Sequence, residues 1–147
     1  MKYKNVQAMI LSCVVVWGAA VSVCAVPVVS PEGQALMAKA VAAECGDASL
    51  GVQIGLAAVI LHRMETVGFP DTAAGVIYSD AFLACTRTGR IALPMTKEKW
   101  QLASYAVRCA CAGMDPTEGA LYFSSEETGA LVTDRQLRYG DEGYLFY

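Results

Sequence analysis

The segment Leu50–Thr66, LGVQIGLAAVILHRMET, has the regular apolar pattern of a buried helix. Its apolar positions recur at helical spacing and are Val52, Leu56, Val59, Ile60 and Met64. The segment therefore predicts the central helix of the core. Gly51 and Gly55 lie four residues apart within it, and we expect them to permit the close approach of another helix at some cost in helix propensity.

A second helix is predicted just upstream. Ser30 suits an N-cap and Pro31 the first helical position, and an alanine-rich apolar stretch follows them. Gly46 indicates the end of the helix two residues after Glu44. The turn that follows, which includes Asp47, leads directly into the central helix.

Glu44 is the residue in this helix that suggests chemistry. Its carboxyl group is predicted to project from a helix C-terminus beside apolar neighbours, and both desolvation and the negative end of the helix dipole disfavour the ionised form. A protonated carboxylic acid is what the general acid of glycosidic bond cleavage requires. The alternative is an exposed glutamate on a last turn, which is the usual position of a carboxylate.

The remaining chain predicts a smaller set of elements. We expect a short helix over about 72–78, an irregular loop over 79–95, and a long helix from the Thr96 cap to about Ala112. Residues available for packing on this last helix are Trp100, Ala103, Tyr105, Ala106 and Val107. Two aromatic segments preceded by glycine, 119–123 and 143–147, predict two strands of a small sheet. The fold class is therefore α+β and mainly α.

Residues 1–25 have the pattern of a secretory signal peptide. Lys2 and Lys4 precede an apolar run, and Val23-Cys24-Ala25 fits a small-residue cleavage site. If it is not cleaved, the segment is a possible N-terminal membrane anchor. Cleavage leaves 26–147 as one domain, placed outside the cell or in the cell envelope.

The net charge limits the classes of ligand that the predicted domain can bind. The chain has a formal net charge of −3, and loss of the two signal lysines makes the domain more acidic. A mildly acidic domain without a basic run argues against nucleic acid. Binding to an anionic cell wall must then come from a shaped groove. No residue cluster demands a metal or a cofactor.

Four cysteines lie in the predicted domain: Cys45, Cys85, Cys109 and Cys111. Export favours disulfides, and four cysteines allow three connectivities. Cys109 and Cys111 point apart on a predicted helix, so we do not expect them to pair with each other. Because export favours disulfides, a bridge from Cys85 to one of them is the pairing we expect. A four-cysteine zinc site is the alternative, and the presence of only one close pair disfavours it.

Several motifs occur along the chain in a fixed order. They are Ala43-Glu44-Cys45-Gly46-Asp47, residues 55–63 (GLAAVILHR), Gly68-Phe69-Pro70-Asp71-Thr72, residues 75–78 (GVIY), Phe82, Gly89-Arg90-Ile91, Asp115-Pro116-Thr117, residues 119–123 (GALYF) and the terminal Phe146-Tyr147. This ordered set resembles the cell wall hydrolase family of the spore cortex-lytic type (SleB/CwlJ-like). The resemblance covers essentially the whole predicted domain.

The resemblance implies a lysozyme-like, lytic transglycosylase-like domain that cleaves peptidoglycan between N-acetylmuramic acid and N-acetylglucosamine. The family's catalytic glutamate falls on Glu44. A transglycosylase needs one acid, which protonates the glycosidic oxygen and then deprotonates the muramoyl 6-hydroxyl. Hydrolysis by a muramidase usually needs a second carboxylate. Asp47 is the nearest in sequence, and we favour for it a turn-forming or N-cap role.

Candidate substrate-binding residues follow from side-chain chemistry. Tyr122, Phe82 and Tyr78 are predicted to line a sugar cleft, because aromatic faces stack on pyranose rings; core packing is the alternative. Arg63 at the end of the central helix is a candidate for a carboxylate or lactyl group. A structural ion pair is its alternative role.

The chain departs from the family pattern at several positions. The family usually has Asn at His62, polar residues at Leu83 and Ala84, Asn at Ser124 or Ser125, and His at Tyr144. These departures motivate a second hypothesis, a non-catalytic wall-binding module. A third is a cysteine peptidase or amidase with Cys45 as nucleophile and His62, the only histidine, as base.

Overall fold

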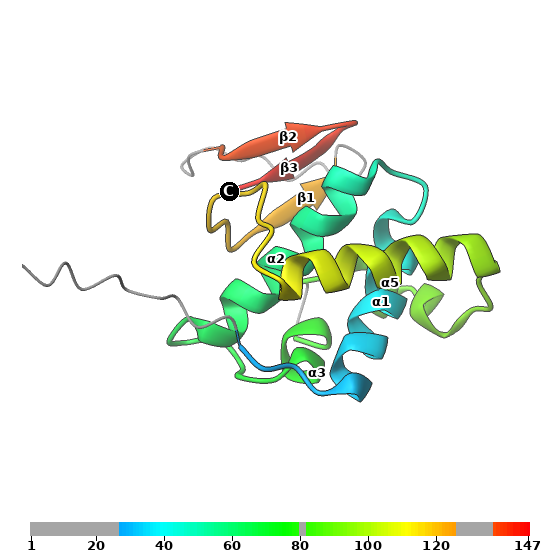
Figure 1. Cartoon of the computed structure of the whole chain (residues 1–147), viewed down its shortest axis with the longest axis horizontal. Helices are drawn as coiled ribbons and strands as arrows, with labels where there is room; N and C mark the ends of the chain where they lie inside the picture. The colour runs from blue at the N-terminus through cyan, green and yellow to red at the C-terminus, as the bar shows by residue number, and fades with distance from the viewer. Residues whose placement is uncertain (1–26, 80–81, 126–136) are drawn as a thin grey trace, which may run out of the picture.

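The computed structural model describes residues 27–79, 82–125 and 137–147 (Figure 1). The helices are α1 (Pro31–Cys45), α2 (Leu50–Glu65), α3 (Ala73–Ile77), α4 (Ala84–Arg87), the 3-10 helix η1 (Arg90–Ala92) and α5 (Lys97–Cys111). The strands are β1 (Phe123–Ser125), β2 (Tyr139–Asp141) and β3 (Tyr144–Phe146). The predicted fold class, mainly α with a small antiparallel sheet, is confirmed.

Side-chain caps begin the three long helices. Ser30 Oγ accepts from Gly33 N at 3.1 Å, and Thr96 Oγ1 accepts from Lys99 N at 3.3 Å, so both predicted starts are confirmed. At the start of α2 the cap is Ser49, whose hydroxyl accepts from Val52 N at 3.4 Å. The N-cap role considered for Asp47 is therefore wrong.

Helix α2 is the centre of the core, as its apolar pattern predicts. Every residue from Val52 to Leu61 is buried, and α1 and α5 pack against the helix (Figure 1). On α5 the small residues Ala103 and Ala106 are buried. Two larger residues predicted to pack are instead on the surface: Trp100 is 38% exposed and Tyr105 49%. The alanines let α5 lie close to the other helices, which leaves no space for rings on that face.

The sheet has the order β1-β3-β2, with β3 antiparallel to both neighbours. The prediction at 143–147 matches β3. The prediction at 119–123 meets β1 only at Phe123, and β2 was not predicted. Three-residue strands such as Tyr-Gly-Asp are too short to show the alternation by which strands are recognised.

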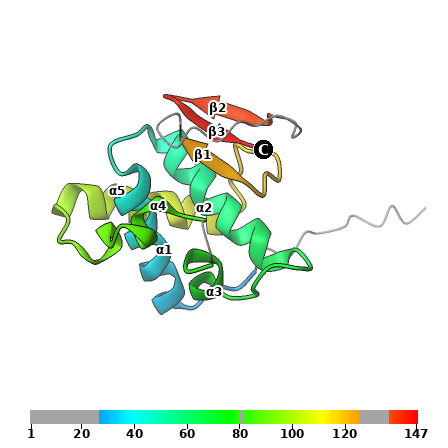
Figure 2. The same ribbon diagram turned by 180° about the vertical axis from the view of Figure 1, so that it is seen from behind.

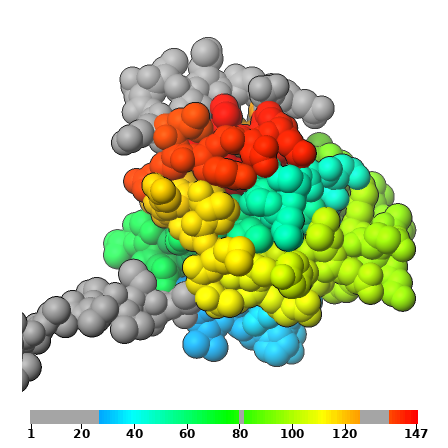
Figure 3. Space-filling model, turned by 45° about the horizontal axis from the view of Figure 1, so that its top comes forward, coloured from blue at the N-terminus to red at the C-terminus, as the bar shows by residue number. Residues whose placement is uncertain are grey.

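The sheet covers the first half of α2 (Figure 3). A Cβ added at Gly55 would lie 3.0 Å from both the Phe146 ring and Thr117 Cγ2, and one at Gly51 would lie 2.8 Å from the Tyr139 hydroxyl. These glycines therefore admit the sheet and the loop before it. The expected close approach of another helix at these positions is wrong.

Residues 82–95 have regular structure where an irregular loop was predicted. They contain α4 and η1, which pack against α1 (Figure 2). Neither helix is long enough to show a period in sequence. No helix in the described ranges has the length and apolar character needed to cross a bilayer. The predicted signal peptide at 1–25 lies outside the described residues.

Candidate functional site

Glu44 lies in the last turn of α1, and its side chain is only 6% exposed. Its carboxylate accepts hydrogen bonds from Ala84 N at 3.3 Å and Cys85 N at 2.7 Å. Leu83, the N-cap residue of α4, makes no side-chain cap. Glu44 therefore satisfies the first free N–H groups of α4 from another helix, in the place of a local cap.

The surroundings of Glu44 are more polar than its sequence neighbours suggest. Arg90 Nη2 lies 3.8 Å from the Glu44 carboxylate, in addition to the two N–H donors. All three stabilise negative charge, whereas burial and the helix end oppose it. Sequence analysis missed these partners because they lie 40 or more residues along the chain, in a segment without a recognisable pattern.

Two cavities meet at Glu44. The first, the aromatic cavity, has a volume of about 300 Å³ and is lined by Glu44, Arg63, Phe82, Ala84, Arg87, Tyr122, Phe123, Ser124, Ser125 and Tyr147. The second, the helix-end cavity, has about 600 Å³ and its lining includes Glu44, Asp47, Ala84, Arg90, Lys99, Ser125, Glu142 and Tyr144. Glu44, Ala84 and Ser125 line both cavities, so the two cavities adjoin at the carboxylate.

Arg63 is enclosed by aromatic rings at the wall of the aromatic cavity. Its guanidinium carbon lies 3.7 Å from the centroid of Phe82, 4.9 Å from that of Phe69 and 5.3 Å from that of Tyr122. Its Nε donates to the Leu121 carbonyl at 2.6 Å, and the residue is 7% exposed. Cation–π contacts and this hydrogen bond fix both the arginine and the rings.

The structure thus brings together four of the five predicted site residues, namely Glu44, Arg63, Phe82 and Tyr122. Tyr147 also lines the cavity and stacks on Tyr122 at 5.8 Å, and the sequence reasoning did not single it out. Its terminal aromatic motif was the available signal.

Tyr78 is the predicted site residue that lies elsewhere. It is the C-cap of α3, is 58% exposed and lines neither cavity. Asp47 does line the helix-end cavity. Its side chain is 85% exposed and accepts a 2.6 Å hydrogen bond from Lys99 Nζ.

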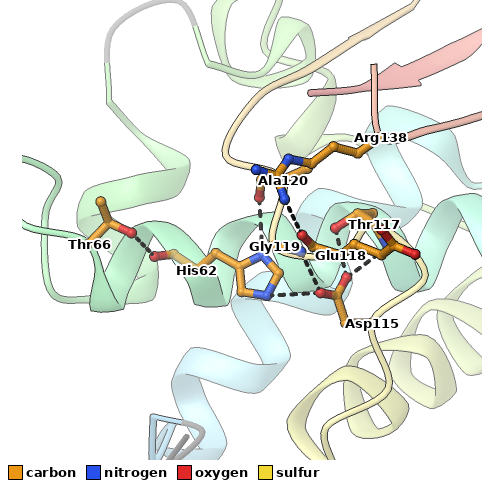
Figure 4. Close-up of polar contacts among 8 residues, drawn as sticks. All are labelled: His62, Thr66, Asp115, Thr117, Glu118, Gly119, Ala120 and Arg138. Carbon is orange, nitrogen blue, oxygen red and sulfur yellow. Dashed lines mark hydrogen bonds and ion pairs between the residues drawn. The ribbon is translucent and has the colours of Figure 1, made fainter. Parts of the chain in front are cut away.

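His62 joins α2 to the loop that leads into β1 (Figure 4). Its Nδ1 lies 3.0 Å from the Ala120 carbonyl and its Nε2 3.3 Å from Asp115 Oδ2. Asp115 also accepts from Thr117 N, Thr117 Oγ1 and Gly119 N. Burial raises the pKa of Asp115, but the hydrogen bonds from Thr117 and Gly119 and the His62 charge outweigh it, so the pKa is lowered overall.

This arrangement contradicts a Cys45–His62 dyad. The Cys45 thiol is buried and donates to the Val41 carbonyl at 3.4 Å, within its own helix. Burial, followed by the charges of Glu44 and Cys85, raises the pKa of the Cys45 thiol far above its usual value. A thiol that does not ionise is a poor nucleophile, and His62 is directed to other partners.

The four cysteines of the described chain are free thiols, so the expected bridge from Cys85 to Cys109 or Cys111 is not formed. Cys85 is buried with its sulfur 3.8 Å from the Ala40 carbonyl. Burial, followed by hydrogen bonding to Glu44 and its charge, raises the pKa of Cys85 to about 12. Within the described ranges no three His, Cys, Asp or Glu side chains gather to hold a metal ion.

Comparison with known proteins places this geometry in context. Residues 48–141 match the family described as Cell Wall Hydrolase. The spore cortex-lytic enzyme of Bacillus cereus is 39% identical over 94 residues, which are 63% of this chain and 34% of that protein. That of Bacillus subtilis strain 168 is 34% identical over 93 residues, 63% of this chain and 29% of that protein. The chain thus spans about a third of the length of these relatives.

Two solved structures share the fold. The catalytic domain of the Bacillus cereus SleB protein superposes with a TM-score of 0.70 and 31% identity, covering 84% of this chain and 95% of that one. The catalytic domain of the germination-specific lytic transglycosylase SleB from Bacillus anthracis gives 0.67 and 31%, covering 80% and 94%. The lysozyme-like fold expected from the sequence is confirmed.

Proposed function

This chain belongs to the cell wall hydrolase family, and we propose that it cleaves peptidoglycan glycan strands as a lytic transglycosylase, between N-acetylmuramic acid and N-acetylglucosamine. The observation that supports this most directly is the position of Glu44, a nearly buried carboxylate where two cavities meet. The family match begins after Glu44, so its role as acid and base rests on this geometry and on the motif around it.

In the proposed reaction Glu44 acts twice. Its acid form donates a proton to the glycosidic oxygen, and the C1–O bond breaks. The carboxylate then takes the proton of the muramoyl 6-hydroxyl as that oxygen bonds to C1, which gives a 1,6-anhydro end and restores the acid. The Ala84 and Cys85 N–H groups orient the carboxylate and stabilise its charge between the two steps.

Among the described residues, the two other carboxylates that line the cavities favour a single-acid reaction. Asp47 is paired with Lys99 at 2.6 Å, and Glu142 accepts from Ser49 N at 2.6 Å. Each of these carboxylates therefore already has a hydrogen-bond donor. A hydrolytic muramidase usually needs a second free carboxylate on the opposite face of the sugar, so these contacts support transglycosylation.

Substrate binding is assigned to the aromatic cavity. Tyr122 and Phe82 line this cavity, and we assign the sugar contacts to them. Phe82 is only 9% exposed, with Arg63 over its ring, and the partly exposed Tyr122 stacks on Tyr147, so any contact uses the remaining exposed parts of these rings. We give Tyr78 no such role, because it lies outside both cavities.

Three of the departures from the family pattern, at Leu83, Ala84 and Tyr144, leave the hydrogen bonds of Glu44 in place, while Ser124 and Ser125 line the aromatic cavity. Ala84 contributes to Glu44 through its backbone N–H, which does not depend on its side chain, and Leu83 is fully buried. Tyr144 stacks on Phe123 at 5.6 Å. These contacts favour an enzyme over a non-catalytic binding module.

We further propose that residues 1–25 direct export and that 26–147 act outside the cell or in the cell envelope.

Mass spectrometry of the muropeptides released from purified peptidoglycan by residues 26–147 tests the proposal. We expect anhydro-muramoyl products, lighter by one water than their hydrolysed equivalents. Reducing muramic ends would identify a muramidase, and no release would identify a binding module. Glu44→Gln should abolish release, while Glu65→Gln, which changes an exposed glutamate outside both cavities, should not. Equal release by both variants would exclude Glu44 as the acid.

A further inference from the structure

Two arginines of one short segment line the two cavities that share Glu44. Arg87, the last residue of α4, lines the aromatic cavity, and Arg90, the first residue of η1, lines the helix-end cavity. We propose that they bind carboxylate groups on either side of the reacting bond, so that the cleft selects glycan strands with free acidic substituents. This rests on the proposed function and names its substrate class.

The backbone between the arginines explains how they reach different cavities. Gly89 has φ +74°, a left-handed conformation that glycine adopts without strain. It forms the turn between α4 and η1, which separates the two side chains. Both helices pack against α1, which carries Glu44 (Figure 2). Both arginines therefore belong to the segment 84–92, whose first two backbone N–H groups bind the Glu44 carboxylate.

Arg87 has its donors available to a ligand. It is exposed, and in the described part of the chain it makes no hydrogen bond or ion pair. The other basic groups at the cavities are engaged: Lys99 by Asp47, Arg63 by the Leu121 carbonyl, and Arg90 by Glu44 at 3.8 Å. Arg90 is still 49% exposed, which leaves part of its guanidinium open to the cavity.

The aromatic cavity is the more basic of the two cavities. Arg63 and Arg87 line it with one acidic residue, Glu44, whereas Arg90 and Lys99 line the helix-end cavity together with Glu44, Asp47 and Glu142. A local excess of positive charge attracts an anionic ligand, while the net charge of −3 on the whole chain disfavours binding of that ligand elsewhere. The planar guanidinium also matches a carboxylate with two parallel hydrogen bonds.

These features distinguish between kinds of glycan. A neutral glycan offers hydroxyl and acetamide groups, which the aromatic wall can bind without the arginines. Peptidoglycan strands carry peptides with free carboxylates along the chain. Arg90 already contacts Glu44, whereas Arg87 has no such partner among the described residues. We therefore assign the stem-peptide carboxylates to Arg87 and to the exposed part of the Arg90 guanidinium.

Binding measurements in the Glu44→Gln background separate recognition from turnover. The probes are purified, fluorescently labelled peptidoglycan strands and the same strands with their carboxylates converted to amides. We expect the free acid to bind about tenfold more tightly at low salt, and Arg87→Gln or Arg90→Gln to weaken its binding about three- to tenfold. Neither variant should change binding of the amidated strands. Arg108→Gln, an exposed position on α5 outside both cavities, is the matched control.

Equal binding of the free-acid and amidated strands overturns the inference, and so does the absence of measurable binding of the free-acid strands. An arginine variant that weakens binding of both kinds of strand equally also overturns it. Thermal unfolding of each variant excludes misfolding as the cause. The two proposals fail separately. Selective binding without cleavage by the unmutated chain would overturn only the proposed reaction, whereas cleavage without carboxylate selectivity would overturn only the role of the arginines.

Discussion

The Glu44 carboxylate accepts a 2.7 Å hydrogen bond from the backbone N–H of Cys85, at the start of a helix that has no cap of its own. The carboxylate that we propose as the acid therefore also stabilises the start of α4. Substitutions of Glu44 should reveal this second role in the absence of any substrate.

We expect Glu44→Ala to destabilise the fold by about 1–2 kcal/mol, since it removes the acceptor for the first N–H groups of α4. Glu44→Gln keeps one oxygen acceptor and should cost less. Urea denaturation of both variants gives the comparison. If the alanine variant is as stable as the unmutated chain, the cap is not a stabilising interaction.

Asp115 should make stability depend on pH on the acidic side. Its pKa in the folded state is lowered below the ordinary value of 3.8, so the stabilisation it gives is complete above that value and is lost as pH falls through the lowered one. Asp115→Asn should therefore destabilise the chain near neutral pH, by about 1–2 kcal/mol, and less in acid. Unfolding free energies measured from pH 6 to pH 2 test this. A difference that does not change with pH would contradict it.

Gly55 and Gly51 form a matched pair of probes for the contact between α2 and the sheet. Gly55→Ala places a Cβ 3.0 Å from the Phe146 ring and Thr117 Cγ2, and should cost about 1–3 kcal/mol. At Gly51 the near atom is the hydroxyl at the end of a tyrosine, which can move, so Gly51→Ala should cost less. Differential scanning calorimetry of both variants decides, and the reverse order would mean that the sheet yields easily at Phe146.

Cleavage should be insensitive to thiol reagents at pH 8. Cys45 and Cys85 are buried, and burial raises the pKa of Cys85 to about 12, so both remain protonated. Cys109 and Cys111 are partly exposed, but burial also raises the pKa of the Cys111 thiol, so Cys109 should be the position that iodoacetamide labels first. Peptide mapping by mass spectrometry, with cleavage measured before and after labelling, tests this. Inactivation that accompanies labelling of Cys45 would revive the cysteine peptidase hypothesis.

Much of this fold can be predicted from local sequence patterns. Ser30 and Thr96 were recognised because a helix cap acts on residues three positions away, and α2 because its apolar positions are periodic. The contacts of Glu44 with Cys85 and Arg90 connect segments 40 or more residues apart and leave no local signal. Strand β2 and helix α4 were missed for the related reason that tertiary contacts stabilise them.

The cleft residues show the same division. The family motif and its local chemistry predicted Glu44, and side-chain chemistry predicted Arg63, Phe82 and Tyr122; the structure gathers all four around one cavity. Tyr78 was predicted on the same grounds as Phe82 and Tyr122 and lies in the motif of residues 75–78, yet it is at the end of α3 and faces solvent. A motif shows that a residue belongs to a family pattern, whereas its position relative to Glu44 depends on how the helices pack.

The stretch 84–92 holds Glu44 through two backbone donors and carries both Arg87 and Arg90. Exchange of this stretch for the equivalent stretch of a related chain would therefore replace the two backbone donors to Glu44 and both arginines at once. If the proposed roles of Glu44, Arg87 and Arg90 hold, such an exchange changes substrate preference and catalytic competence together. An engineer who wishes to alter the first alone must change the arginine side chains and leave the backbone as it is.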